Sequence, residues 1–211
     1  AAAGDVDGDG YADVAAGASG AYTNTGKAYL FLGAAAGLGP TPIWTARGEN
    51  EGDWFGSGIQ TAGDVNGDGH ADLLVGAYGY PAWAQRGNVY LYAGSPAGPG
   101  AAAAWTATGE ADGDYFGMAI HSAGDVDGDG YADLLVGAFG YAGGAQEGRV
   151  SLYLGNGGGG RVVLARAARG DGSGLPVQPW GLTHAQSSFE ARAWATAPQG
   201  RDRVKLQVQA C

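Results

Sequence analysis

The chain has 211 residues, including 43 glycines and 8 prolines, and 45% of its residues are hydrophobic. Glycine and proline together approach the level of a disordered low-complexity chain, but the apolar fraction is large enough to bury a core. No apolar run reaches the ~18 residues of a membrane-spanning helix, so we expect no membrane span. The first residue is Ala and no basic-then-apolar segment follows, so we expect no signal peptide and interpret the sequence as a processed chain or a fragment. The single cysteine, Cys211, excludes an internal disulfide and a cysteine-based zinc site.

Charge is distributed unevenly along the chain. Residues 1–155 carry 18 acidic and 4 basic side chains, whereas residues 156–211 carry 3 acidic and 7 basic ones. An acidic body disfavours nucleic acid and anionic membranes, because both carry phosphate charge, and it favours cations. We therefore expect no nucleic-acid partner.

The acidic body is built from a repeated unit. The stretch WTARGENEGDWFGSGIQTAGDVNGDGHADLLVGAYGY from Trp44 recurs 61 residues later as WTATGEADGDYFGMAIHSAGDVDGDGYADLLVGAFGY from Trp105. A third copy starts within the unit at Gly4, with GDVDGDGYADVAAGAS. We divide the body into a partial repeat over 1–43, a repeat over 44–104 and a repeat over 105–155.

Each unit has the pattern of short β-strands. In chain order, strands are expected over Asn88–Tyr92, Trp105–Thr108, Phe116–Ser122 and Ala132–Phe139, each rich in aromatic or aliphatic residues and bounded by turn residues. The alanine runs at 34–36 and 101–104 are flanked by glycine or proline, and we interpret them as linkers or strand ends. Four short strands per unit are typical of a propeller blade, which must stack on its neighbours to bury both faces.

The C-terminal segment, residues 156–211, is expected to supply a strand of the last blade and a β-rich tail. Gly155–Gly160 is interpreted as a hinge or turn, and its match to the GxGxxG spacing is discounted because a strand from Arg161 follows instead of a helix. Further strands are predicted over Phe189–Ala195 and over Arg203–Gln209, where apolar and polar residues alternate.

The chemistry of the body lies in three acidic loops, Asp5–Asp13 (DVDGDGYAD), Asp64–Asp72 (DVNGDGHAD) and Asp125–Asp133 (DVDGDGYAD). Numbered from the first Asp, each loop has oxygen-bearing side chains at positions 1, 3, 5 and 9 and a glycine at position 6. Position 7, which is Tyr11, His70 or Tyr131, would offer its carbonyl oxygen. Ca²⁺ prefers about six to eight oxygen ligands in a flexible cage, and carboxylates this close repel one another without a counterion. The alternative is a set of metal-free Asp-Gly turns.

Other cation sites fit the loops less well. An EF-hand needs Glu at position 12, where these loops have Ala16, Val75 or Val136, and here a strand follows instead of a helix. Mg²⁺ prefers fewer protein ligands and a strict octahedron. We therefore predict up to three Ca²⁺ ions in this chain.

The unit resembles the FG-GAP repeat of integrin α-subunit propellers and of many bacterial surface proteins. Phe55-Gly56 and Phe116-Gly117 precede acidic loops, which are followed by Gly76-Ala77-Tyr78 and Gly137-Ala138-Phe139; the N-terminal copy has Gly17-Ala18-Ser19. The resemblance covers about residues 1–155. It implies an all-β fold, a partial β-propeller of about three four-stranded FG-GAP blades with a C-terminal β-rich extension. It also implies Ca²⁺ in the loop that joins the first two strands of each blade. By matching position, the implied side-chain ligands are Asp5, Asp7, Asp9 and Asp13; Asp64, Asn66, Asp68 and Asp72; and Asp125, Asp127, Asp129 and Asp133.

The implied function is that of a calcium-stabilised extracellular or cell-surface scaffold for adhesion or protein interaction. A carbohydrate-binding propeller, or a non-catalytic propeller appendage of a secreted hydrolase, is the alternative. The partner is thus a protein or a glycan, and because three blades do not close a ring, the remaining blades come from the same longer chain or from another copy.

Three further features of the sequence bear on function. No catalytic motif occurs and the three histidines, His70, His121 and His184, are scattered, so we expect no enzyme. Arg169-Gly170-Asp171 spells a tripeptide that many integrins bind, but Arg47-Gly48-Glu49 and Thr108-Gly109-Glu110 hold the same repeat position, which favours an inter-blade turn. The aromatic residues Trp54, Phe55, Tyr115 and Phe116 are interpreted as blade packing in preference to a sugar-stacking platform.

Overall fold

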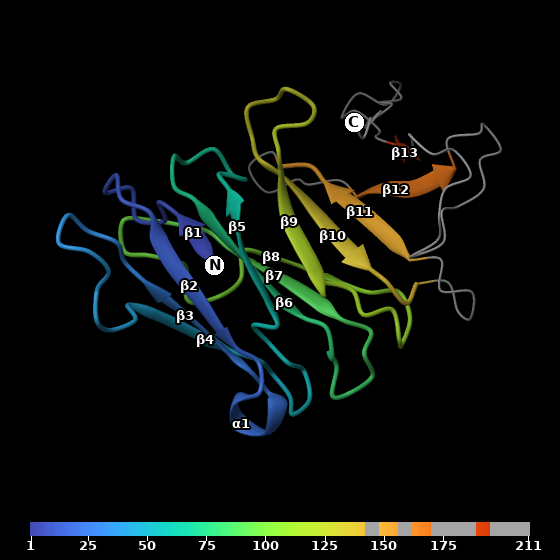
Figure 1. Cartoon of the computed structure of the whole chain (residues 1–211), viewed down its shortest axis with the longest axis horizontal. Helices are drawn as coiled ribbons and strands as arrows, with labels where there is room; N and C mark the ends of the chain where they lie inside the picture. Colours follow the sequence, from blue (N-terminus) through green and yellow to red (C-terminus); the bar gives the residue numbers. More distant parts are fainter. Residues whose placement is uncertain (142–147, 156–161, 170–188, 195–211) are drawn as a thin grey trace.

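A computed structural model describes residues 1–141, 148–155, 162–169 and 189–194, and they form three antiparallel sheets (Figure 1). The first sheet contains β1 (Ala2–Gly4), β2 (Asp13–Ala18), β3 (Lys27–Phe31) and β4 (Trp44–Arg47). The second contains β5 (Gly58–Gly63), β6 (Asp72–Ala77), β7 (Asn88–Tyr92) and β8 (Trp105–Thr108). The third contains β9 (Ala119–Gly124), β10 (Asp133–Ala138), β11 (Arg149–Tyr153), β12 (Val162–Arg169) and β13 (Phe189–Trp194).

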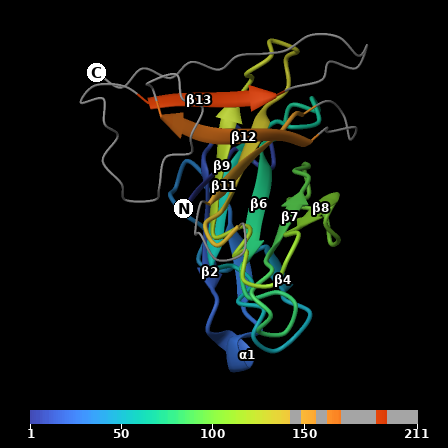
Figure 2. The same cartoon turned by 90° about the vertical axis from the view of Figure 1, so that its right-hand side faces the viewer.

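In every sheet, strands that follow one another in the chain are neighbours, so each sheet is an up-and-down meander. The prediction of an all-β partial propeller with about three blades is therefore confirmed. The third sheet differs from the other two in its fifth strand, because β13 pairs with β12. Figure 2 shows β12 and β13 running across the direction of the other strands.

Most predicted strands are present at the predicted residues. β7 and β8 have the predicted bounds, and β10, β12 and β13 lie within or overlap the predicted runs. The strand expected over Phe116–Ser122 instead begins at Ala119. The reason is that Gly117 has a φ of +82° and its N–H bonds to the carbonyl of Gly137, so Phe116 and Gly117 form a turn that enters the strand. The predicted strand over Arg203–Gln209 and most of Arg169-Gly170-Asp171 lie outside the described residues.

The sequence units and the sheets differ in phase. Trp44 and Trp105 begin the units of the sequence, but β4 pairs with β3 and β8 pairs with β7 as the outer strands of the preceding sheets. A sheet therefore ends a few residues after the next sequence unit begins. A strand from the following unit thus closes the first sheet and the second sheet, and this ties neighbouring units together.

The core lies between the sheets. One apolar cluster joins Ala15, Ala28 and Leu30 of the first sheet to Leu73 and Val75 of the second. A second cluster joins Leu74, Val89 and Leu91 of the second sheet to residues of the third. β6 is buried on both faces, so after Asp72 its residues 73–77 carry no polar side chain and do not alternate.

The two ends of the sheets differ in character. The acidic loops join β1 to β2, β5 to β6 and β9 to β10, and they lie at the upper end in Figures 1 and 2. The opposite end carries α1 (Ala21–Asn24), a short segment in which Tyr22 and Thr23 have left-handed backbone angles. In the described part of the chain, no helix has the length and apolar character needed to cross a bilayer.

Candidate metal sites

Each acidic loop is wound around the carboxylate of its first residue. The Asp5 carboxylate accepts hydrogen bonds from the N–H groups of Gly8 (2.8 Å), Asp9 (3.0 Å) and Gly10 (2.9 Å). Asp64 accepts the corresponding bonds from residues 67–69 and Asp125 from residues 128–130. The glycine at position 6 has a φ of +91°, +86° or +92° in the three loops, a left-handed conformation that glycine adopts without strain.

The ninth residue fixes the loop to the sheet. Asp13 is 1% exposed, and its carboxylate accepts the N–H groups of Val6 (2.8 Å) and Gly33 (2.9 Å). Asp72 and Asp133 are fully buried and accept equivalent bonds, from Val65 and Gly94 and from Val126 and Gly155. One donor in each pair belongs to the loop and the other to the segment after the sheet's third strand, so this carboxylate joins the two.

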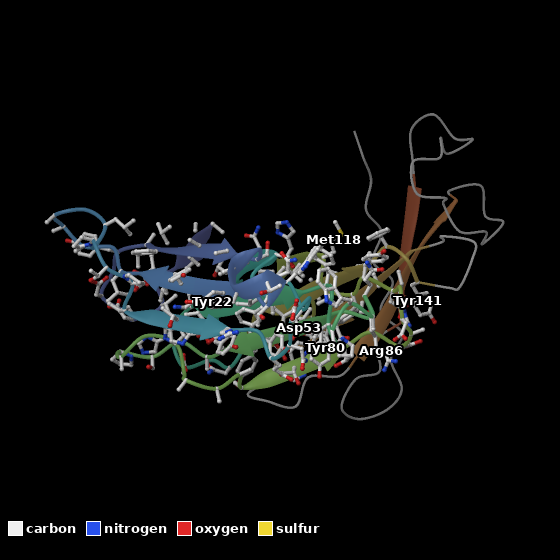
Figure 3. The ribbon with its side chains drawn as sticks, turned by 90° about the horizontal axis from the view of Figure 1, so that it is seen from below. Tyr22, Asp53, Tyr80, Arg86, Met118 and Tyr141 are labelled. Atoms are coloured by element: carbon white, nitrogen blue, oxygen red, sulfur yellow. The ribbon has the colours of Figure 1, made fainter. Side chains whose placement is uncertain are left out.

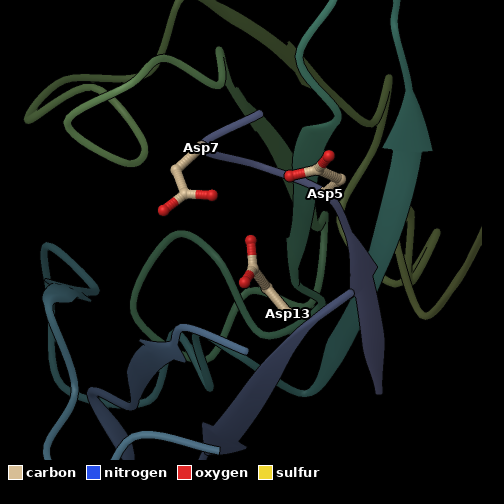
Figure 4. Close-up of side chains that lie close together, drawn as sticks. All are labelled: Asp5, Asp7 and Asp13. Atoms are coloured by element: carbon tan, nitrogen blue, oxygen red, sulfur yellow. The ribbon is translucent and has the colours of Figure 1, made fainter. Parts of the chain in front are cut away.

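Three of the four predicted side-chain ligands converge in the first and third loops. Carboxylate oxygens of Asp5, Asp7 and Asp13 lie within 4.8 Å of one another, as do those of Asp125, Asp127 and Asp133. Figure 4 shows the first set turned toward a common space. The position-5 residues Asp9 and Asp129 are not part of these groups, and each accepts a bond from the N–H of the position-7 residue, Tyr11 or Tyr131.

The middle loop has the same backbone arrangement with one amide in place of a carboxylate. Asn66 occupies position 3, and its Nδ2 donates to Asp68 at 2.9 Å. The Asp68 carboxylate also accepts the N–H of His70 at 2.9 Å, as Asp9 and Asp129 do for their position-7 residues. An amide oxygen is a Ca²⁺ ligand of the same hard type, so the substitution lowers the loop's charge without changing the class of donor.

The carboxylates of the loops carry negative charge, and neither of the two ion pairs in the described part of the chain involves one of them. Burial raises the pKa of Asp72 to about 6, and the nearby Asp68 and Asp64 add to this rise, while bonds from Gly94 and Val65 oppose it. Burial also raises the pKa of Asp7, Asp127 and Asp133, with neighbouring aspartates adding repulsion. A bound cation would remove this penalty, because it supplies the opposite charge to an oxygen-only donor set.

Sequence reasoning missed two further buried aspartates, which lie outside the acidic loops. Asp53 is fully buried and its carboxylate accepts N–H groups from Glu49 (3.0 Å), Asn50 (2.6 Å) and Ala82 (3.0 Å). Asp114 holds the same repeat position, and it accepts from Glu110 and Ala111. Asp53 thus joins the connection between the first two sheets to the loop between β6 and β7, at the end of the molecule that Figure 3 faces. The repeat could have revealed them, because an Asp precedes the two aromatic residues in both complete repeats, as GDWFG and as GDYFG.

The predicted packing role of the aromatic pairs holds for one member of each pair. Phe55 is fully buried and Phe116 is 4% exposed, each in a cluster between sheets. Their neighbours Trp54 and Tyr115 lie instead in a line of side chains that we call the aromatic row. Its contacts, by distance between ring centroids, are Trp83–Trp54 (5.9 Å), Trp54–Tyr78 (4.6 Å), Tyr78–Tyr115 (6.2 Å) and Tyr115–Phe139 (4.5 Å).

Comparisons with known proteins agree with this geometry. A model of the FG-GAP-like repeat matches residues 64–136, and a model of the FG-GAP repeat matches residues 1–31. The chain is similar to integrin alpha-5 of Xenopus laevis, with 32% identity over 148 residues, and to integrin alpha-PS2 of Drosophila melanogaster, with 38% identity over 156 residues. It is also 42% identical to human integrin alpha-IIb over 117 residues.

The matched region is a small part of these relatives. It covers 64% of this chain but 14% of integrin alpha-5 and 11% of integrin alpha-PS2, and 52% of this chain but 11% of integrin alpha-IIb. The protein is an FG-GAP repeat protein of the integrin-α-like type, and its three sheets are blades of that repeat.

Proposed function

We propose that the chain is part of a calcium-stabilised extracellular propeller that serves adhesion or protein interaction and has no catalytic activity. The observation that carries this proposal is the acidic loop, repeated three times with the same hydrogen bonds and with a buried aspartate at position 9. The side-chain ligands would be those at positions 1, 3, 5 and 9 of each loop, and the carbonyl oxygens of Tyr11, His70 and Tyr131 would add a fifth. Ca²⁺ in these loops would be structural, since it offsets the repulsion that opposes folding.

We place this propeller outside the cell, where the calcium concentration is high enough to fill sites of moderate affinity. Calcium sites in extracellular modules bind at about 10⁻⁴–10⁻³ M, a range filled outside the cell and not in the cytosol. The similarity to integrin α chains supports the same location and an interaction role. Isothermal titration calorimetry of the whole chain should give close to three Ca²⁺ ions per molecule. A chain that binds no Ca²⁺ at millimolar concentration would remove the basis of this proposal.

The partner blades of this propeller should cover the open face of the first sheet. Val14 and Ala16 of β2 point away from the second sheet; Val14 is 37% exposed and Ala16 is also exposed. Their counterparts in β6, Leu73 and Val75, are fully buried against the first sheet. The same apolar positions are thus covered where a preceding blade is present, which supports a further FG-GAP blade, from the same protein or from another copy, as the occupant. Light scattering after size exclusion should then show association that rises with concentration.

Carbohydrate binding is a second candidate, and the aromatic row is the observation that favours it. Trp83 and Phe139 at its two ends are each 49% exposed, and Trp54 and Tyr115 adopt left-handed backbone angles that place their rings in the row. Exposed aromatic rings beside polar groups can stack on sugar rings, and Arg86 and Asp112, which pair at 2.8 Å, lie on the same connections. A glycan array tests this candidate: a hit should be lost in Trp83→Ala and kept in Met118→Ala, an exposed residue outside the row. No hit would leave adhesion through protein contacts as the only candidate.

A further inference from the structure

The acidic loops of neighbouring sheets are in direct contact, and the contact involves their first and eighth positions. The N–H of Ala71 in the second loop donates to the carbonyl oxygen of Asp5 in the first loop at 2.9 Å. The N–H of Ala132 in the third loop donates to the carbonyl oxygen of Asp64 in the second loop at 2.8 Å. The same bond therefore occurs at both interfaces between sheets, which makes it a property of the repeat.

The two partners in this bond sit beside the predicted ligands of different ions. Asp5 is a predicted ligand, and its carboxylate organises the first loop through three N–H bonds. Ala71 directly precedes Asp72, the buried position-9 ligand of the second loop. Ordering Asp5 therefore fixes the acceptor on which the second loop is docked, and docking the second loop in turn restrains Asp5.

The position-7 side chain makes a second contact between loops. The ring of His70 lies over Gly8 so closely that a Cβ on this glycine would be 2.7 Å from a ring carbon. The ring of Tyr131 covers Gly67 in the same way, at 2.5 Å. Gly8 and Gly67 each donate their N–H to the first carboxylate of their loop, so the covering ring packs on the turn that shapes the neighbouring site. Tyr11 holds this position in the first loop and is 45% exposed, since no preceding loop is present in the described part of the chain.

We propose that the acidic loops bind Ca²⁺ cooperatively, and that His70 and Tyr131 are positioning residues for the ion in the preceding sheet. This inference rests on the calcium sites proposed above. Without an ion, mutual repulsion spreads the carboxylates and loosens the loop on which the next loop is docked. With an ion, the loop is ordered, and the neighbouring loop then loses less conformational freedom when it binds its own ion. Because such coupling is reciprocal, each loop raises the affinity of the other by the same factor.

The test uses the whole chain with the third loop disabled by Asp127→Ala and Asp129→Asn, so that two sites remain. Calorimetric Ca²⁺ titration should then show a Hill coefficient above one. Disabling the first loop as well, by Asp7→Ala and Asp9→Asn, should weaken binding to the second loop by about fivefold or more. The reverse experiment, with Asn66→Ala and Asp68→Asn, should weaken the first loop by the same factor.

The positioning role is tested in the same two-site background. His70→Ala keeps the main-chain carbonyl but removes the ring, so it should lower the Hill coefficient toward one. Tyr11→Ala makes the same change in a loop whose ring covers no other loop, and it should leave the coupling unchanged. Equal effects of the two variants, or a second-loop affinity that is unchanged or stronger after the first loop is disabled, would overturn the proposal. Independent binding would overturn the coupling alone, whereas absence of any Ca²⁺ binding would overturn the proposed function with it.

Discussion

The substitution Asp72→Asn tests the two roles proposed for a position-9 aspartate, which are to accept hydrogen bonds from the main chain and to bind Ca²⁺. The carboxylate accepts the N–H groups of Val65 and Gly94, both at 2.9 Å, and it is a predicted Ca²⁺ ligand. Asparagine retains one acceptor oxygen and turns an NH₂ group toward the other N–H. Asp72→Asn therefore loses one charge-assisted hydrogen bond, which contributes about 1.5–3 kcal/mol. Without Ca²⁺, relief of repulsion from Asp64 and Asp68 offsets part of this loss, so we expect a small fall in melting temperature.

The larger effect should appear when Ca²⁺ is present. An ion at a concentration about 100-fold above its dissociation constant stabilises the folded state by about 2.7 kcal/mol per site. For a chain of this size, 1 kcal/mol corresponds to about 2–4 °C in melting temperature. Each loop should therefore contribute about 5–10 °C to the rise that Ca²⁺ produces, and Asp72→Asn, which removes one negative charge from the second site, should reduce the total rise by up to about a third.

The assay is thermal unfolding by circular dichroism, in chelator and in excess Ca²⁺. A pH of about 8 keeps Asp72 ionised, because burial raises its pKa only to about 6. Asp53→Asn is the matched control, since Asp53 is an equally buried aspartate with three N–H bonds outside the acidic loops. It should lower the melting temperature in both conditions and leave the Ca²⁺-dependent rise intact. A rise in Asp72→Asn as large as in the wild type would refute the assignment of this residue as a ligand.

Three further predictions concern the packing of the sheets. Gly69→Ala puts an alanine at a left-handed backbone angle with open space around its Cβ, and it should destabilise the fold by about 1–2 kcal/mol. Gly76→Ala would bring the new Cβ within 2.2 Å of the Gly117 oxygen and should destabilise the fold by at least about 3 kcal/mol. Urea unfolding measures both changes. Phe116→Ala should reduce the free energy of unfolding by about 3–5 kcal/mol, and an effect below 1 kcal/mol in the same titration would contradict its place in the core. Val14→Asp should hardly change the melting temperature of the dilute protein but should abolish concentration-dependent association in light scattering; unchanged association would mean that another surface is responsible.

The acidic loops could be predicted from the sequence because their bonds are local. Asp5 binds N–H groups three, four and five residues ahead, so the aspartates and glycines that make the turn are adjacent in the chain. The repeat made the same pattern visible three times, and the apolar runs before and after the loops identified most of the strands.

Contacts between units could not be seen in the same way. Whether Phe55 or Trp54 is buried depends on the sheet that covers it, and Asp53 is satisfied in part by Ala82, 29 residues away. The entry turn at Phe116 and Gly117 depends on a bond to Gly137 in β10, the strand that pairs with β9, and it displaced the expected start of β9.

The sequence by itself determined the class of fold, the repeat and the three acidic loops, because strand periodicity and loop hydrogen bonds depend on residues close together in the chain. Tertiary structure alone decided which face of each sheet is covered, which strand closes each sheet, and how His70 and Tyr131 reach the preceding loop. Those features arise from stacking one sheet on the next, which brings together residues about 60 positions apart in the repeated unit.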